Sequence, residues 1–271
     1  VDTSDVNKKE DPMATQETRP VQTRSSNGIL QIIMNRPEKK NALTQEMYAL
    51  MTDALTYAAE EGSIRVAVFQ GTDGVFCAGN DLQDFLGTPI SEKSPVFQFI
   101  ESLIAFPKIL AANVEGVAIG IGTTMLLHCD LVYASDNAFF QLPFSRLGLC
   151  AEAGSSVLLP RAIGMTRAAT LLTTGDSIDS RTAAEWGLIS AFFPEEIFET
   201  EAMKRLGQVA AMPPAALRHT RALLRKPLEE EVRAAVLRES RQFQECLQGA
   251  EAAEALRAFL EKRPPDFSSF A

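Results

Sequence analysis

The sequence predicts an α/β fold with mainly parallel strand pairing and a C-terminal region built only from helices. Short apolar runs typical of buried strands alternate with segments of helical periodicity through the first two thirds of the chain. Beyond Pro194 only helical patterns remain, broken at Pro213-Pro214, Pro227, Gly249 and Pro264-Pro265. The chain has 271 residues, 46% hydrophobic and 23% charged, which is the composition of a globular protein.

Each element follows from local signals. Val1 to Pro20 is polar and charged, so residues 1–20 are expected to be flexible, with order beginning after the Asn27-Gly28 turn. Strands are expected at 29–34, 65–70, 109–114, 131–134, 139–141 and 188–193. Helices are expected at 44–62, before Pro107, after Gly122, from about Gly154 and Thr166, and at 180–186. The α/β core therefore spans residues 21–194 and the helical region residues 195–271.

Charge and composition exclude several classes of function. The formal net charge is −9, which disfavours nucleic-acid binding because phosphate contacts need a basic surface. The longest uncharged apolar stretch, Gly116 to Cys129, is too short to span a bilayer, so no membrane association is expected. We find no secretory signal pattern and no C-terminal SKL, which favours a cytoplasmic protein.

Cysteine and histidine spacing gives no metal site. The four cysteines, at positions 77, 129, 150 and 246, are far apart, which favours reduced thiols in a cytosol-like compartment. His128 and His219 lie at no ligand spacing and are interpreted as core or surface residues.

Two glycine-containing segments could place backbone donors at helix N-termini. They are 76–82, Phe-Cys-Ala-Gly-Asn-Asp-Leu, and 117–122, Val-Ala-Ile-Gly-Ile-Gly. Two such turns facing each other would supply a pair of N–H groups for a developing oxyanion. Alternatively, the glycines only permit tight turns and close packing.

Glu152 is the one charged residue between Leu147 and Leu159. Apolar surroundings would raise its pKa toward the range useful for proton transfer. The alternative is a structural carboxylate near the start of a helix.

Asp130 and Asp136 flank a strand and are interpreted as structural. Arg36, Lys39 and Lys40 form a small basic cluster that could bind phosphates, or could be a solvated loop.

Several motifs together resemble the crotonase (enoyl-CoA hydratase/isomerase) superfamily from about Gly28 to Phe267. They are Asn35-Arg-Pro37, Asn41-Ala-Leu43, Phe76-Cys-Ala-Gly-Asn-Asp-Leu82, Gly116-Val-Ala-Ile-Gly-Ile-Gly122, Cys129-Asp-Leu-Val-Tyr-Ala-Ser135, Ala184-Glu-Trp-Gly-Leu188 and Ala258-Phe-Leu-Glu-Lys-Arg263. The resemblance implies a spiral core of ββα turns, a C-terminal helical trimerisation region, a homotrimer or dimer of trimers, and an acyl-CoA substrate.

The resemblance also implies roles for individual residues. The N–H groups of Asn80 and Ile121 would form the oxyanion hole. The positions matching the family's CoA-binding segments are Lys39, Lys40, Ala42, Ala78, Asp81 and Leu82.

The departures from the family indicate the reaction. Hydratases of this family use two glutamates, and the matching positions here are Thr124 and Phe144, which argues against hydration. The 143–156 segment is similar to the peroxisomal type of Δ3,Δ2-enoyl-CoA isomerase, whose catalytic glutamate matches Glu152. The resemblance thus implies isomerisation of 3-enoyl-CoA to trans-2-enoyl-CoA by one carboxylate, with no cofactor beyond the CoA of the substrate. Another acyl-CoA reaction on this fold, or a non-catalytic acyl-CoA-binding protein, is the alternative.

Overall fold

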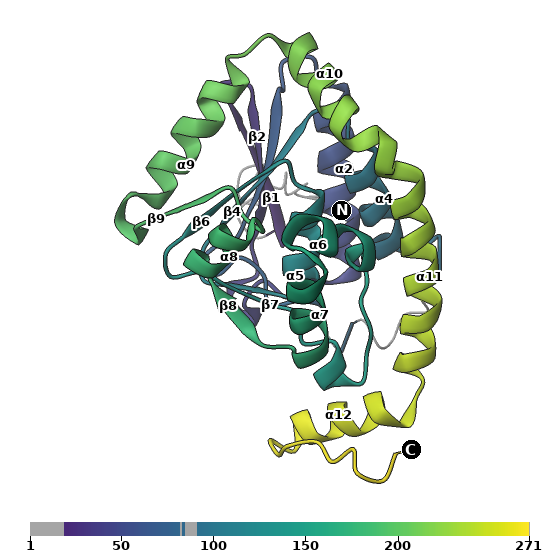
Figure 1. Ribbon diagram of the computed structural model, residues 1–271. Coiled ribbons are helices and arrows are strands. Elements are labelled where there is room, and N and C mark those ends of the chain that lie inside the picture. The colour runs from purple at the N-terminus through teal and green to yellow at the C-terminus, as the bar shows by residue number, and fades with distance from the viewer. Residues whose placement is uncertain (1–18, 82, 85–90, 271) are drawn as a thin grey trace, which may run out of the picture.

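The computed structural model of the chain describes residues 19–81, 83–84 and 91–270 (Figure 1). The strands are β1 (Val21–Ser26), β2 (Ile29–Met34), β3 (Val66–Gln70), β4 (Ile109–Val114), β5 (Val117–Ile119), β6 (Leu131–Ser135), β7 (Phe139–Gln141), β8 (Ser177–Asp179) and β9 (Ala191–Phe193). The helices of the first part are α2 (Gln45–Glu60), α4 (Pro95–Ala105), α5 (Ile121–Thr124), α6 (Ser155–Ile163), α7 (Met165–Thr174) and α8 (Ser180–Trp186). The C-terminal helices are α9 (Glu195–Ala210), α10 (Pro214–Arg225), α11 (Glu229–Leu247) and α12 (Ala250–Leu260), and the short 3-10 helices are η1 (Pro37–Lys39), η2 (Met125–His128), η3 (Ser145–Leu147) and η4 (Lys226–Leu228).

The described strands form two sheets. The larger has the order β1-β2-β3-β4-β6-β9 and is parallel except for the antiparallel β1–β2 pair. The smaller has the order β5-β7-β8, with β5 and β7 parallel and β7 and β8 antiparallel. Every residue of β4 is buried, as expected for a central parallel strand that is covered on both faces.

The two faces of the large sheet are covered by different helices. Because successive strand side chains point to opposite faces, Ala67 and Phe69 of β3 join the core under α2 and α4, whereas Val66 and Val68 join a second core under α9. Figure 1 shows α9 on one side of this sheet and α2 with α4 on the other. The C-terminal region therefore supplies the second covering layer through α9, rather than forming a layer wholly apart from the sheet.

Helix α2 forms where its sequence signals place it. The Thr44 hydroxyl accepts a hydrogen bond from the N–H of Met47 at 3.2 Å and caps the helix. Met47, Met51 and Leu55 recur at helical spacing and are buried.

Asp130 is structural, as predicted: it ion-pairs with Arg221 at 2.7 Å and Arg225 at 2.9 Å.

Three strands were not predicted, and one prediction about order was wrong. Asn27 and Gly28 have positive φ angles of 51° and 78° and join β1 to β2 as a hairpin, so order begins before this turn. β1 has five polar residues after Val21, so no apolar run or alternation marks it as a strand; it is an edge strand with most residues exposed. β5 and β8 are three-residue strands inside segments dominated by turn signals.

Among the described helices, none is both long and apolar enough to cross a bilayer.

Candidate active site

The first glycine turn presents the N–H of Asn80. The N–H of Leu43 donates to the Gly79 carbonyl at 2.8 Å, and the N–H of Asp81 donates to the Leu43 carbonyl at 2.8 Å. These bonds form a parallel bridge in which Asn80 lies opposite Leu43. Because alternate residues of such a ladder direct their N–H groups to opposite sides, the N–H of Asn80 points away from Leu43.

The second turn lies directly beside the first. Ile119 donates its N–H to the Cys77 carbonyl at 2.9 Å, and Gly120, with φ at 57°, then leads into α5. Ile121 is the first residue of α5, so its N–H has no acceptor within that helix. A Cβ at Gly122 would lie 2.7 Å from the Cys77 carbonyl oxygen, so only glycine allows the turns to pack this closely. The structure thus places both predicted donor turns side by side.

Tyr48 of α2 holds the side chain of Asn80. Its hydroxyl donates to the Asn80 Oδ1 at 2.5 Å, and the tyrosine is fully buried. Burial, followed by the nearby charge of Glu152, raises the pKa of the Tyr48 phenol well above its usual value. Tyr48 therefore stays protonated and connects the first donor turn with the surroundings of Glu152.

Glu152 lies on the segment before α6 and faces α5. The buried Thr124 hydroxyl donates to its Oε1. Removal of the carboxyl from water raises the pKa of Glu152 to about 8, although the Thr124 hydrogen bond lowers it and Glu239 raises it further. The residue as a whole is only partly buried. Such a group can accept or release a proton near neutral pH.

A strained turn follows Glu152. Ala153 and Gly154 both have positive φ angles, 55° and 76°. His128 Nε2 lies 2.8 Å from the Ala153 carbonyl oxygen, so this ring nitrogen is the donor. Burial lowers the pKa of His128 to about 4, so the ring is neutral. His128 is a core residue, in agreement with its sequence interpretation, and it supports the backbone next to Glu152.

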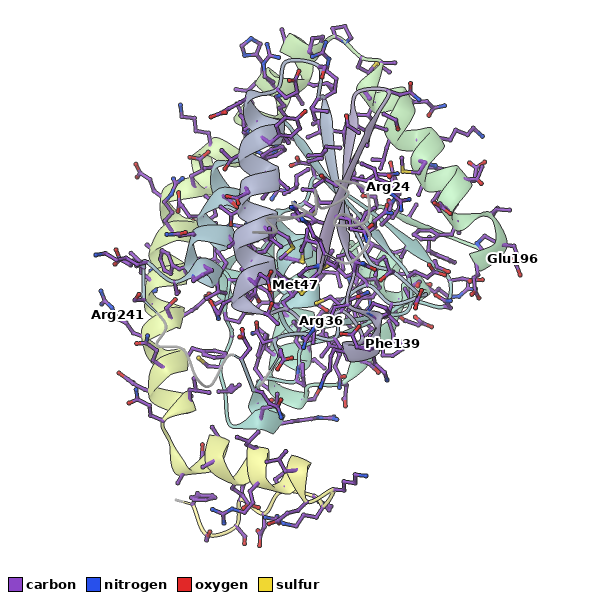
Figure 2. The ribbon with its side chains drawn as sticks, turned by 180° about the vertical axis from the view of Figure 1, so that it is seen from behind. Arg24, Arg36, Met47, Phe139, Glu196 and Arg241 are labelled. Carbon is purple, nitrogen blue, oxygen red and sulfur yellow. The ribbon has the colours of Figure 1, made fainter. Side chains whose placement is uncertain are left out.

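The two segments expected to bind CoA meet in the structure. The N–H of Ala78 donates to the Lys40 carbonyl at 3.0 Å, and Lys39 and Lys40 are exposed beside this contact. Arg36 ion-pairs with Asp81 at 2.7 Å, and this hydrogen bond lowers the pKa of Asp81. Figure 2 shows Arg36 below Met47 of α2.

Of the other residues expected at the CoA site, Ala42 accepts a hydrogen bond from Arg36 through its carbonyl at 3.1 Å. Leu82 lies outside the described residues.

Thr124 and Phe144, at the positions of the hydratase glutamates, both lie at the site. Thr124 contacts Glu152 directly. A Cβ at Gly120 would lie 3.9 Å from the Phe144 ring, which places Phe144 beside the second donor turn. Among the described residues, no group of three His, Cys, Asp or Glu side chains has the arrangement of a metal site.

Sequence reasoning did not find Tyr48, His128 or Glu239 as parts of the site. Tyr48 is 32 residues from Asn80, and His128 is 25 residues from Ala153. No local motif marks them, and each is recognisable only once the fold brings it to its partner.

Comparisons with known proteins add to this geometry. A family model described as "Enoyl-CoA hydratase/isomerase" matches residues 24–269. Enoyl-CoA delta isomerase 2 of Rattus norvegicus is 36% identical over 92% of this chain, which spans only 65% of that relative's length. The 2,3-dehydroadipyl-CoA hydratase of Escherichia coli K12 is 33% identical, over 88% of this chain and 94% of its own length.

A solved structure shows a closely similar fold. It is that of an enoyl-CoA hydratase/isomerase from Pseudoalteromonas atlantica T6c, with a TM-score of 0.88 at 38% identity. The match covers 92% of this chain and all of that one.

Proposed function

The chain belongs to the enoyl-CoA hydratase/isomerase family, and on that premise we propose that it converts 3-enoyl-CoA to trans-2-enoyl-CoA with Glu152 as the single proton shuttle. The family match and the solved structure confirm the crotonase-like fold class. The observation that carries the proposal is the desolvated carboxyl of Glu152, with its pKa raised to about 8, next to α5 and its donor turn.

The reaction needs one base and one site for negative charge. The Glu152 carboxylate removes a proton from C2, and the electrons move into the thioester carbonyl to form a dienolate. The N–H groups of Asn80 and Ile121 stabilise the oxygen of the dienolate, and each such donor is typically worth roughly 10²–10³ in rate. Glu152 then returns the proton to C4 as the double bond moves to C2, so atoms and charge balance without another reactant.

The surroundings of Glu152 support one-carboxylate chemistry. Thr124 donates to Glu152 instead of offering a second carboxylate, and Phe144 adds an apolar ring near the second donor turn. Hydration is a second candidate because the Escherichia coli relative is named as a hydratase. Adding water to a double bond needs groups that position the water and handle its protons, and neither matching position carries a carboxylate.

Assay of one matched pair of variants tests the proposal. Glu152→Gln should lower 3-enoyl-CoA turnover by about 10²–10⁴-fold, the usual contribution of general acid–base catalysis. Glu196→Gln changes an exposed carboxylate on α9, a helix that contributes no residue to the candidate site described above, and should leave turnover unchanged. Near-wild-type turnover by Glu152→Gln would contradict the proposal.

The same assays separate the alternatives. Rapid water addition to crotonyl-CoA would indicate hydration. Thioester cleavage or chain cleavage would indicate hydrolase or lyase activity, and tight CoA binding without any product would indicate a binding protein.

We also propose that the exposed Lys39 and Lys40 bind the CoA phosphates, with Ala42, Ala78 and Asp81 lining the same region. The contact between the two segments supports this role. Phosphates attract exposed lysines through charge, so binding should weaken as salt increases.

The proposal includes a trimer formed through the C-terminal helices. Leu223 and Leu224 on α10 are 78% and 68% exposed, and Met212 just before this helix is 53% exposed. Such an apolar surface favours contact with another subunit. Light scattering of the purified protein should give three or six times the protomer mass, and a monomer would contradict this part.

The cytoplasmic localisation expected from the sequence is tested by cell fractionation.

A further inference from the structure

Glu239 is a buried carboxylate that the proposed reaction does not use. It lies on α11 and is only 6% exposed. Its Oε2 accepts the N–H of Gly154 at 2.6 Å, and its Oε1 accepts the N–H of Ser156 at 2.9 Å. Arg241, two residues further along α11, points outward in Figure 2, as expected because two residues span about 200° of a helix. Glu239 thus faces inward, across 85 residues of sequence from Gly154.

The two N–H groups belong to the start of α6, immediately after Glu152. Ala153 and Gly154 have positive φ angles, a conformation that is costly for alanine. His128 donates to the Ala153 carbonyl, and Glu239 accepts from the Gly154 and Ser156 N–H groups. These contacts fix the backbone direction at Glu152 and hence the direction of its side chain.

Glu239 also places negative charge near Glu152. Its two carboxyl oxygens accept backbone N–H groups at the N-terminal end of α6, the end that carries partial positive charge. Its charge contributes to the raised pKa of Glu152, after the larger effect of burial.

Other titratable groups near Glu152 stay uncharged. Tyr48, from α2, is a protonated phenol, and His128, from η2, is a neutral ring. Cys150, on the same segment as Glu152, has a pKa raised to about 12, mainly by burial and the adjacent Cys246. Among these neighbours Glu239 is therefore the group that brings charge.

We propose that Glu239 is a positioning residue for Glu152: it fixes the turn that directs the Glu152 carboxyl and places a second negative charge beside it. The proposal rests on the proposed function, because it treats Glu152 as the reacting carboxylate. It makes α11 of the C-terminal region part of the machinery that tunes the reaction.

Three variants separate charge, hydrogen bonding and general effects. Glu239→Gln removes the charge and keeps an oxygen acceptor, whereas Glu239→Ala removes both. Glu245→Gln changes an exposed carboxylate on the same helix and is the matched control. Each is compared with wild type as the purified full chain, after circular dichroism has shown that it is folded.

The first measurement does not depend on turnover. Protein with ¹³C-labelled glutamate carboxyls is titrated by NMR, and the Glu152 signal is assigned by its loss in Glu152→Gln. In Glu239→Gln the midpoint of Glu152 should move to lower pH, because a repelling charge is gone. In Glu245→Gln it should stay in place. An unchanged midpoint in Glu239→Gln would overturn the electrostatic part.

The second measurement addresses the turn. Amide hydrogen exchange at Gly154 and Ser156 should be at least about tenfold faster in Glu239→Ala than in wild type, because both N–H groups lose their acceptor. Exchange in Glu239→Gln should lie between the two. Unchanged exchange in Glu239→Ala would overturn the positional part.

Kinetics then connect Glu239 to the reaction. In Glu239→Gln the acidic limb of the pH profile should move to lower pH, in step with the NMR midpoint, and kcat should change more than KM. If wild type converts 3-enoyl-CoA while the limb stays in place, Glu239 has no tuning role. If wild type converts none, the proposed function fails, and the NMR and exchange results still decide the role of Glu239.

Discussion

Replacing Glu152 with glutamine should stabilise the protein in alkali and change its stability little in acid. Burial raises the pKa of Glu152 from 4.5 to about 8. Below about pH 4.5 the carboxyl is protonated in both the folded and the unfolded chain, so it imposes no penalty. Between the two values the folded chain holds a proton that the unfolded chain has lost, so stability falls as pH rises. Above about pH 8 the penalty is complete.

The magnitude follows from the two pKa values. They differ by about 3.5 units, and each unit corresponds to about 1.4 kcal/mol, which sets an upper limit of about 5 kcal/mol. Glu152 keeps some contact with solvent, so we expect about 2–4 kcal/mol. Glutamine has nearly the same shape as a protonated glutamate and still accepts from the Thr124 hydroxyl, so it removes the penalty without opening a cavity.

Chemical denaturation measures this difference. Wild type and Glu152→Gln are unfolded in urea at about pH 4, below both pKa values, and at about pH 9, at one protein concentration because oligomerisation would otherwise alter apparent stability. The variant should gain stability over wild type only at the higher pH. An equal difference at both pH values would refute the assignment of the raised pKa to Glu152.

Three further predictions concern activity. The value of kcat/KM for 3-enoyl-CoA should rise with pH to a half-maximum at about pH 8, because Glu152 must be ionised to accept the C2 proton; a flat profile from about pH 6 to about pH 9 would argue against this. Changing Lys39 and Lys40 together to glutamine should raise the KM for acyl-CoA several-fold with little effect on kcat. The difference in KM between this variant and wild type should become smaller as salt is added. Equal KM values for the two proteins at low salt would exclude these lysines from binding. Gly122→Ala should lower kcat by about 10²-fold or more, because its Cβ would meet the Cys77 carbonyl and displace the second donor turn; unchanged kcat would mean that the turn tolerates the shift.

Local signals were sufficient for much of the fold. Thr44 caps α2 as expected, and the apolar run of β4 is a strand with the predicted bounds. The strand expected at 188–193 is reduced to Ala191–Phe193, since the N–H of Leu188 donates to the Ala183 carbonyl and so still belongs to the end of α8. Short strands such as β5 depend on their partners, because three residues carry too little periodicity to identify them.

The candidate site was only partly readable from the sequence. The isolation of Glu152 among apolar residues indicated a raised pKa, which agrees with its value of about 8. The surroundings that produce this pKa come from elsewhere in the chain: Thr124 is 28 residues from Glu152, and Glu239 is 85 residues from Gly154. Contacts of that kind depend on tertiary packing and leave no local pattern. The roles of Asn80, Ile121 and Glu152 in catalysis remain predictions.

Isotope transfer within the substrate tests the central claim most directly. A 3-enoyl-CoA deuterated at C2 is converted in ordinary water during a single turnover, and the product is examined by NMR and mass spectrometry. A carboxyl that takes the label and returns it before exchange with solvent should leave deuterium at C4 of the 2-enoyl-CoA. Product whose new C4 hydrogen comes entirely from water, even at the shortest reaction times, would contradict a single-glutamate shuttle.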